Sequence, residues 1–163
     1  MKRLLPFILL AVTGQGALAL DVSQGDADRG MKIYKDKACT ECHGWSGDGL
    51  NGRHPRSPQG ADLRVTALEN DHLAEVIRCG RPYTPMPYHD NVAYKDDRCY
   101  GMVAADFDPG EMPPRGKTFR EKDLIDLVAY LRRDVIGQGD QTYEDCAAFF
   151  GSSADRFCAY LKP

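Results

Sequence analysis

Four stretches of the chain repeat apolar side chains at the three- and four-residue spacing of an amphipathic helix, and this pattern predicts an all-α fold. Local signals mark several helix ends. Asp26 and Thr142 can cap the first and the last helix, while Asn70 or Asp71 can cap the second, which we expect to end at Gly80. The expected helical stretches are residues 26–37, 70–80, 121–133 and 142–161, the last of these a small helical tail.

The first twenty residues have the pattern of a secretory signal peptide. Met1-Lys2-Arg3 supplies a basic start, residues 4–12 form a short apolar run, and Ala17-Leu18-Ala19 resembles the small residues that precede a cleavage site. The apolar run is too short to cross a bilayer core of about 30 Å, which argues against a membrane anchor. We expect residues 1–20 to be removed, with cleavage after Ala19 or Leu20, and no stable membrane insertion afterwards.

Length and charge narrow the class of protein further. The chain has 163 residues and a formal net charge of −3, from 21 basic and 24 acidic residues. Loss of Lys2 and Arg3 with the signal peptide makes the net charge about −5, which argues against nucleic acid and anionic membrane surfaces as partners. We expect one domain at residues 21–136 and a C-terminal helical extension at residues 137–163 that packs on the same domain.

The first expected helix leads into Cys39-Thr40-Glu41-Cys42-His43, the pattern of a c-type haem attachment site. Thiols at this spacing can add to the two vinyl groups of one porphyrin, and the next residue can offer its imidazole to the iron. A zinc site needs a second ligand pair, and the sequence has no other Cys-x-x-Cys motif or close histidine pair. A thioredoxin-like redox pair would not need His43 and would follow a strand. We therefore expect one haem c, attached through Cys39 and Cys42, with His43 as a ligand of the iron.

Four further cysteines lie downstream of this motif: Cys79, Cys99, Cys146 and Cys158. In an oxidising compartment an even number of cysteines predicts disulfide bonds. Three pairings are possible, and we favour Cys79–Cys99 with Cys146–Cys158 because each bond then closes a short local loop. In the loop-entropy description each bond stabilises the fold by about 3 kcal/mol.

The motif and its flanking helices resemble class I cytochromes c. A helix with the pattern Gly30-x-x-x-Tyr34 that runs into the Cys-x-x-Cys-His-Gly sequence is the opening of that family. The helix at 121–133, with Tyr130-Leu131, resembles its closing helix. The resemblance spans roughly residues 26–133 and does not account for an insertion or for the tail.

This resemblance implies class I cytochrome c-like helices packed around one covalently bound haem, together with an inserted loop and a disulfide-stapled C-terminal helical extension. It implies that the first and closing helices cross at a small residue. Gly30 suits that position, since glycine costs about 1 kcal/mol relative to alanine inside a helix and is expected where another helix comes close. The resemblance also implies that a proline carbonyl, of Pro55 or Pro58, accepts the N–H of His43.

A distal methionine ligand is implied as well, and two positions fit. Met86 lies between two prolines shortly after the second helix, in a loop that a Cys79–Cys99 bond would rigidify. Met112, which is also followed by proline, has the better spacing to the closing helix. We favour Met86 as the second metal ligand, which makes residues 91–111 an insertion after the ligand loop, whereas Met112 would place the insertion before it.

Three other side chains near these loops need an interpretation. His89 is a further candidate for the distal ligand, and ligation by two histidines would lower the reduction potential. Met102 lacks flanking prolines, so we expect it to pack in the interior. His54 lies in a polar, arginine-flanked loop, where we expect it to be solvated.

Taken with the export signal, the resemblance implies a soluble periplasmic one-electron carrier and not an enzyme. Exported dehydrogenases, including quinoprotein alcohol dehydrogenases, are natural donors to such carriers, and oxidases or other cytochromes are natural acceptors. We expect a monomer that meets these redox partners over its exposed haem edge. Two alternatives stay open, a haem-bearing subunit of a larger oxidoreductase complex and an open-site haem enzyme or gas-binding protein. The tail could cover the haem crevice or meet a partner, although added stability is the simpler role.

Overall fold

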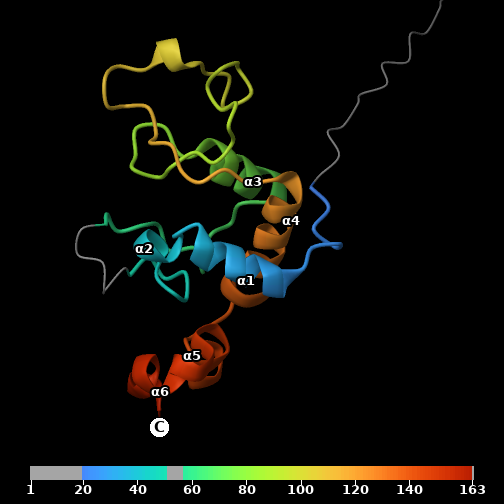
Figure 1. Ribbon diagram of the computed structural model, residues 1–163, viewed down its shortest axis with the longest axis vertical. Coiled ribbons are helices and arrows are strands. Elements are labelled where there is room, and N and C mark those ends of the chain that lie inside the picture. The colour runs from blue at the N-terminus through green and yellow to red at the C-terminus, as the bar shows by residue number, and fades with distance from the viewer. Residues whose placement is uncertain (1–19, 51–56, 163) are drawn as a thin grey trace, which may run out of the picture.

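The computed structural model describes residues 20–50 and 57–162 (Figure 1). The expected signal peptide up to Ala19 and the loop with His54 and Pro55 lie outside the described residues. Within the described ranges there are helices and no strands, as the apolar spacing predicts. The elements are α1 (Ala27–Asp36), α2 (Thr40–His43), α3 (Asn70–Cys79), η1 (Ala104–Asp106), α4 (Glu121–Tyr130), η2 (Leu131–Val135), α5 (Tyr143–Phe150), η3 (Gly151–Ser153), α6 (Ala154–Phe157) and η4 (Ala159–Leu161).

Helices α1 and α4 pack against each other at the centre of the molecule, and Gly30 lies at their contact (Figure 1). A Cβ atom at Gly30 would collide with the carbonyl oxygen of Asp126 and lie 2.6 Å from the Cβ of Tyr130. Only a residue without a side chain allows two backbones to approach so closely. The rings of Tyr34 and Tyr130 pack beside this contact with their centroids 5.5 Å apart. The expected crossing at a small residue is therefore confirmed.

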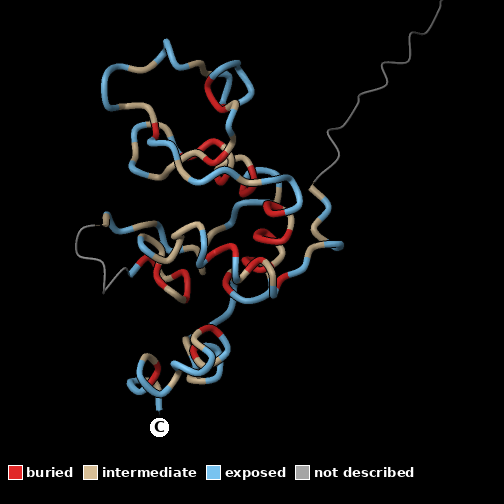
Figure 2. The backbone as a smooth tube through the Cα atoms, in the orientation of Figure 1, coloured by how far each residue is buried: buried red, intermediate tan, exposed pale blue. Residues whose placement is uncertain are grey.

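Buried side chains form two separate cores, a large one and a small one. Figure 2 shows the buried positions of the large core concentrated where α1, α3 and α4 meet. The small core surrounds the Cys79–Cys99 disulfide and includes Tyr94, and both Met102 and Met112 pack against it. Met102 thus packs in the interior, as expected. The large core consists of Ala27, Ile33, Tyr34, Leu73, Ala74, Ile77, Leu124, Leu127, Val128, Tyr130, Leu131, Val135 and Phe149.

The beginning of α3 differs from the prediction. Neither Asn70 nor Asp71 caps the helix, because the N-cap position is Glu69, one residue earlier. The side chain of Asn70 instead accepts a hydrogen bond from Nε of Arg132 at 2.8 Å. The carboxylate of Asp71 accepts the backbone N–H of Leu20. Both side chains that could have capped the helix thus form hydrogen bonds with segments far away in the sequence.

The closing helix is longer than predicted. After Tyr130 it continues into the π-helical turn η2, in which the N–H of Ile136 donates to the carbonyl of Leu131 at 2.7 Å. A wider turn changes the direction in which later side chains point. Leu131 and Val135 are both buried as a result, with exposed fractions of 3% and 1%. The helical segment thus ends at Val135 and not at Arg133.

Both disulfides have the favoured pairing, Cys79–Cys99 and Cys146–Cys158. The second bond joins α5 to the residue that follows α6, and Thr142 caps α5 as expected. The tail packs on the rest of the chain through Phe149, which belongs to the large core. No helix in the described ranges is both long enough and apolar enough to cross a membrane.

Candidate functional site

The two cysteines and the histidine of the motif lie on one helical turn. Ala38 has a positive φ of 64°, which turns the chain sharply between α1 and α2. Cys39 is the N-cap of α2, and the N–H of His43 donates to the Cys39 carbonyl at 2.9 Å. Residues three apart on a helical turn are neighbours on its surface, so Cys39 and Cys42 lie close together. Both are unpaired, whereas all four other cysteines form disulfides.

The imidazole of His43 is held by one backbone hydrogen bond. Its Nδ1 lies 2.8 Å from the carbonyl oxygen of Ala61, to which it donates, and this leaves Nε2 for a metal. A Cβ atom at Gly60 would lie 2.7 Å from the same Nδ1, so the backbone at residues 60–61 fits directly against the ring. Burial lowers the pKa of His43, and the neutral form that results is the form that ligates iron.

The acceptor at His43 corrects one expectation. The family resemblance points to a proline carbonyl, of Pro55 or Pro58, but the acceptor is the carbonyl of Ala61. Pro55 lies outside the described residues. The loop therefore reaches the ring three residues beyond Pro58, and the chemical role of the carbonyl is unchanged because any backbone carbonyl can accept this proton.

The surroundings of the two thiols in the motif raise the pKa of both. Burial of the thiol raises the pKa of Cys39 to about 12, and burial also raises the pKa of Cys42. Among the described residues no three His, Cys, Asp or Glu side chains are grouped so that they could hold a metal ion. A pair of free thiols beside a neutral imidazole fits covalent attachment of a haem.

The C-terminal tail holds the loop that follows the motif. The hydroxyl of Tyr34 first fixes this loop to α1 by donating to the Gly44 carbonyl at 2.9 Å. The next residue, Trp45, packs its ring against Phe149 with centroids 5.9 Å apart, and its Nε1 donates to the hydroxyl of Tyr160 at 3.0 Å. Partners so far apart in the sequence leave no local pattern, and sequence reasoning did not find this contact.

Met86 lies on a different segment, the loop that follows α3. Its carbonyl accepts the N–H of Arg81 at 3.3 Å, and a Cβ atom at Gly80 would lie 2.6 Å from the same oxygen. The residue is half-buried and belongs to neither of the two cores. Met112, in contrast, packs against the small core. Of the two methionines, which are both half-buried, only Met112 thus packs against one of the two cores.

His89 is buried close to the loop of Met86. Its exposed fraction is 6%, its Nδ1 lies 2.7 Å from the carbonyl oxygen of Lys117, and its ring packs on Phe119 with centroids 4.6 Å apart. Burial lowers the pKa of His89. The ring therefore joins the chain before the insertion to the segment after it, a structural role that needs no metal.

One comparison with known proteins gives a match. The model of the family described as cytochrome c matches residues 27–133, more than half of the chain. The matched region begins with α1, contains the motif and both candidate methionines, and ends within η2, so the tail lies outside it. No curated protein and no solved structure matches the chain.

Proposed function

Because the chain belongs to the cytochrome c family, we propose that it carries single electrons on one haem c attached through Cys39 and Cys42. The observation that carries the proposal is the geometry of α2, where two unpaired cysteines share one helical turn with His43, and the Nδ1 of His43 donates to the Ala61 carbonyl. When bound, haem c supplies an iron that alternates between the ferric and ferrous states. Electron transfer of this kind breaks no bond in a substrate, and it is the function of this family rather than catalysis.

The chain's own residues would hold and orient the two side chains that ligate the iron. Ala61 fixes the imidazole of His43 in the orientation and tautomer that leave Nε2 available. Met86 would be the second ligand of the iron, since Met112 packs against the small core. A thioether ligand in an apolar pocket favours the ferrous state and raises the reduction potential. His89 keeps the packing role described above.

The expected route of electrons follows from export. The basic start, apolar run and small residues of the first 20 positions support secretion to the periplasm, where haem c is attached. There the protein would accept electrons from an exported dehydrogenase, for example a quinoprotein alcohol dehydrogenase, and pass them to an oxidase or another cytochrome of the respiratory chain. The tail's contacts with Trp45 and the large core favour a free monomeric carrier over a fixed subunit, because they give the tail an internal role.

The ferric near-infrared spectrum tests the ligand set. The parent protein should show a sulfur–iron charge-transfer band that disappears in Met86→Ala and persists in Met112→Ala, with Met102→Ala as the matched packing control. Loss of the band only in Met112→Ala would keep the function and move the ligand.

Reaction with carbon monoxide tests the alternative of an open site. The reduced parent should bind carbon monoxide slowly, because the thioether occupies the sixth position. Rapid binding, together with a parent spectrum that lacks the sulfur–iron band, would refute the carrier proposal in favour of a haem enzyme or gas-binding protein.

A further inference from the structure

We propose that residues 91–111, the insertion, act as a clamp that holds the loop of Met86 in place, with Tyr94, Cys99 and Tyr100 as its positioning residues. This inference rests on the proposed function, because the clamp matters only if Met86 ligates the iron. It gives the insertion a task in the chemistry of the site: to slow the departure of the sixth ligand.

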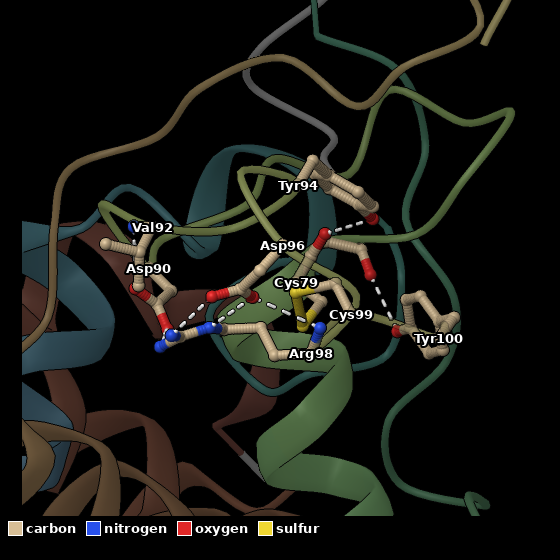
Figure 3. The surroundings of a disulfide bond; sticks show 9 residues. Cys79, Asp90, Val92, Tyr94, Asp96, Arg98, Cys99 and Tyr100 are labelled. Carbon is tan, nitrogen blue, oxygen red and sulfur yellow. Dashed lines mark hydrogen bonds and ion pairs between the residues drawn. A yellow bond between two sulfur atoms is a disulfide. The ribbon is translucent and has the colours of Figure 1, made fainter. Parts of the chain in front are cut away.

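The clamp acts on the last residue of α3 and the residue after it. Cys99 forms the disulfide with Cys79, where α3 ends. The hydroxyl of Tyr94 donates to the carbonyl of Cys79 at 2.7 Å, and the hydroxyl of Tyr100 donates to the carbonyl of Gly80 at 2.8 Å. Figure 3 shows both hydroxyls directed at the main chain around the disulfide. Carbonyls at a helix C-terminus lack helical partners, and here the insertion supplies them.

Fixing the end of α3 also fixes the backbone of Met86. Gly80 has a positive φ of 65°, and a Cβ atom there would lie 2.6–2.8 Å from backbone atoms of Met86, Pro87 and Tyr88. The N–H of Arg81 donates to the Met86 carbonyl at 3.3 Å. The loop therefore leaves Gly80 and returns to contact it, so a shift of Gly80 must displace the residues around Met86.

The far end of the insertion and the residues just after it support the other edge of the loop. The N–H of Tyr83 donates to the carbonyl of Glu111, the last residue of the insertion, at 2.9 Å, and the N–H of Tyr88 donates to the carbonyl of Pro114, beyond the insertion, at 3.0 Å. Within the insertion, Phe107 packs on the Tyr83 ring with centroids 5.9 Å apart and on the Tyr94 ring at 5.1 Å. The loop is thus held between the two ends of the insertion.

Backbone conformation gives a second, independent observation. Tyr83, Tyr94 and Tyr100 have positive φ values of 64°, 59° and 58°, in a region that bulky residues rarely adopt. Such residues persist where the surrounding structure fixes them, and they gather at functional sites and ligand clamps. Three of the four non-glycine residues of this kind in the described ranges belong to the loop of Met86 or to the insertion.

A clamp is useful here because a thioether is a weak ligand for oxidised iron. Sulfur in methionine is a soft donor, and ferric iron is harder than ferrous iron. With Met86 as the ligand, the bond would be weaker when the iron is oxidised. A loop that cannot move away keeps the ligand in place through the ferric half of the cycle, whereas a mobile loop would open the sixth position to other ligands.

The test compares two clamp variants with a matched control in the ferric holoprotein. Tyr100→Phe removes one hydroxyl from a partly exposed ring, Cys79→Ser/Cys99→Ser removes the disulfide, and Cys146→Ser/Cys158→Ser removes the other disulfide, in the tail. Cyanide binding to the ferric iron reports how often the sixth position opens. Amide hydrogen exchange of residues 81–88 reports the motion of the loop itself.

Tyr100→Phe should bind cyanide about fivefold faster than the parent, the factor that corresponds to one ordinary hydrogen bond. The Cys79→Ser/Cys99→Ser variant should bind it faster still, and both should exchange the amides of residues 81–88 faster. The tail control should leave both rates at the parent values. The inference would be overturned if the clamp variants bound cyanide and exchanged their amides at the rates of the parent. It would also be overturned if the tail control accelerated cyanide binding as much as the clamp variants do.

The two readouts separate this inference from the proposed function. If the parent lacks the sulfur–iron band, the assignment of Met86 as ligand fails whatever the variants do. Amide exchange then still decides whether the insertion restrains the loop: faster exchange in the clamp variants supports the restraint, and unchanged exchange refutes it.

Discussion

Replacement of Asp126 measures how far the fold depends on one buried charge where α1 meets α4. The Asp126 side chain is 0% exposed, and its Oδ1 accepts the backbone N–H of Asp26 at 2.8 Å and Nζ of Lys122 at 3.0 Å. Its other oxygen pairs with the guanidinium of Arg29, whose side chain is 29% exposed. Arg29 also pairs with Asp123. One carboxylate therefore joins the start of α1 to the middle of α4.

The size of the effect follows from what each variant leaves without a partner. Asp126→Ala leaves the N–H of Asp26 and one side of the Arg29 guanidinium without an acceptor. Removing one member of a buried ion pair lowers the free energy of unfolding by about 3–5 kcal/mol. Since Arg29 is partly hydrated and keeps Asp123, we expect the lower end, about 3 kcal/mol. Asp126→Asn retains an acceptor and loses the charge, for about 1.5 kcal/mol. Lys122→Ala removes only an exposed partner, for less than about 0.5 kcal/mol.

Urea denaturation followed by circular dichroism measures these free energies of unfolding, and its pH dependence gives a second check. Burial alone would raise the pKa of Asp126, but hydrogen bonds from Asp26, Lys122 and Arg29 lower it overall. A carboxylate with a lowered pKa in the folded state stabilises the protein above its unfolded pKa of about 3.9 and loses this contribution as the pH falls through the folded value. The difference in free energy of unfolding between the parent and Asp126→Asn should therefore have its full size at neutral pH and should decrease below about pH 4.

Two results would refute this reasoning. One is a loss in Asp126→Ala of less than about 1 kcal/mol at neutral pH, well below the cost of breaking a buried pair. The other is a gap between the parent and Asp126→Asn that stays constant as the pH falls. Either result would mean that the carboxylate is hydrated or that its partners find other acceptors.

Two further changes test the packing on either side of this contact. Gly30→Ala should destabilise the protein by about 2 kcal/mol although alanine favours helices, because its Cβ would collide with the backbone of Asp126. A raised melting temperature of this variant would contradict the close approach of the two helices. In the same urea assay, Phe149→Ala should lower the free energy of unfolding by about 3 kcal/mol and Tyr160→Phe by less than about 0.5 kcal/mol, since only Phe149 lies in the core. Equal losses would mean that surface contacts hold the tail.

Local pattern was sufficient for much of this fold. The apolar spacing around Leu124 and Leu127 predicts α4, and the short separations of the cysteines predict both disulfides. Gly30 could be placed at a helix contact because glycine inside a helix weakens it unless a neighbour needs the space. Each of these predictions depends on residues no more than 20 positions apart in the sequence, where spacing alone carries the information.

The predictions that failed depend on contacts across the chain. The carbonyl that meets His43 belongs to Ala61 and not to a proline, because the path of the loop decides which carbonyl reaches the ring. Asn70 and Asp71 have the chemistry of caps, but Arg132 and Leu20 use their side chains. No spacing rule identifies such partners, since they meet only after the helices have packed.

The choice between Met86 and Met112 shows the same limit. Both lie beside prolines, and the sequence offers arguments for each. In the structure Met112 packs against the small core and Met86 does not, and this difference underlies our proposal of Met86 as the ligand. The difference depends on how the insertion folds, so the sequence of either methionine loop by itself does not reveal it.

The placement of the two disulfides has a consequence for how the protein matures. Their loops, 79–99 and 146–158, follow one another and neither encloses the other or residues 39–43. Each bond can therefore close as soon as its own segment emerges, and neither has to wait for cofactor attachment. In an exported chain, the two thiols of the motif would emerge first and would be exposed to oxidation before the other four. If the motif binds haem c as proposed, its two thiols would have to stay reduced until attachment, whereas the other four cysteines can pair within their own segments.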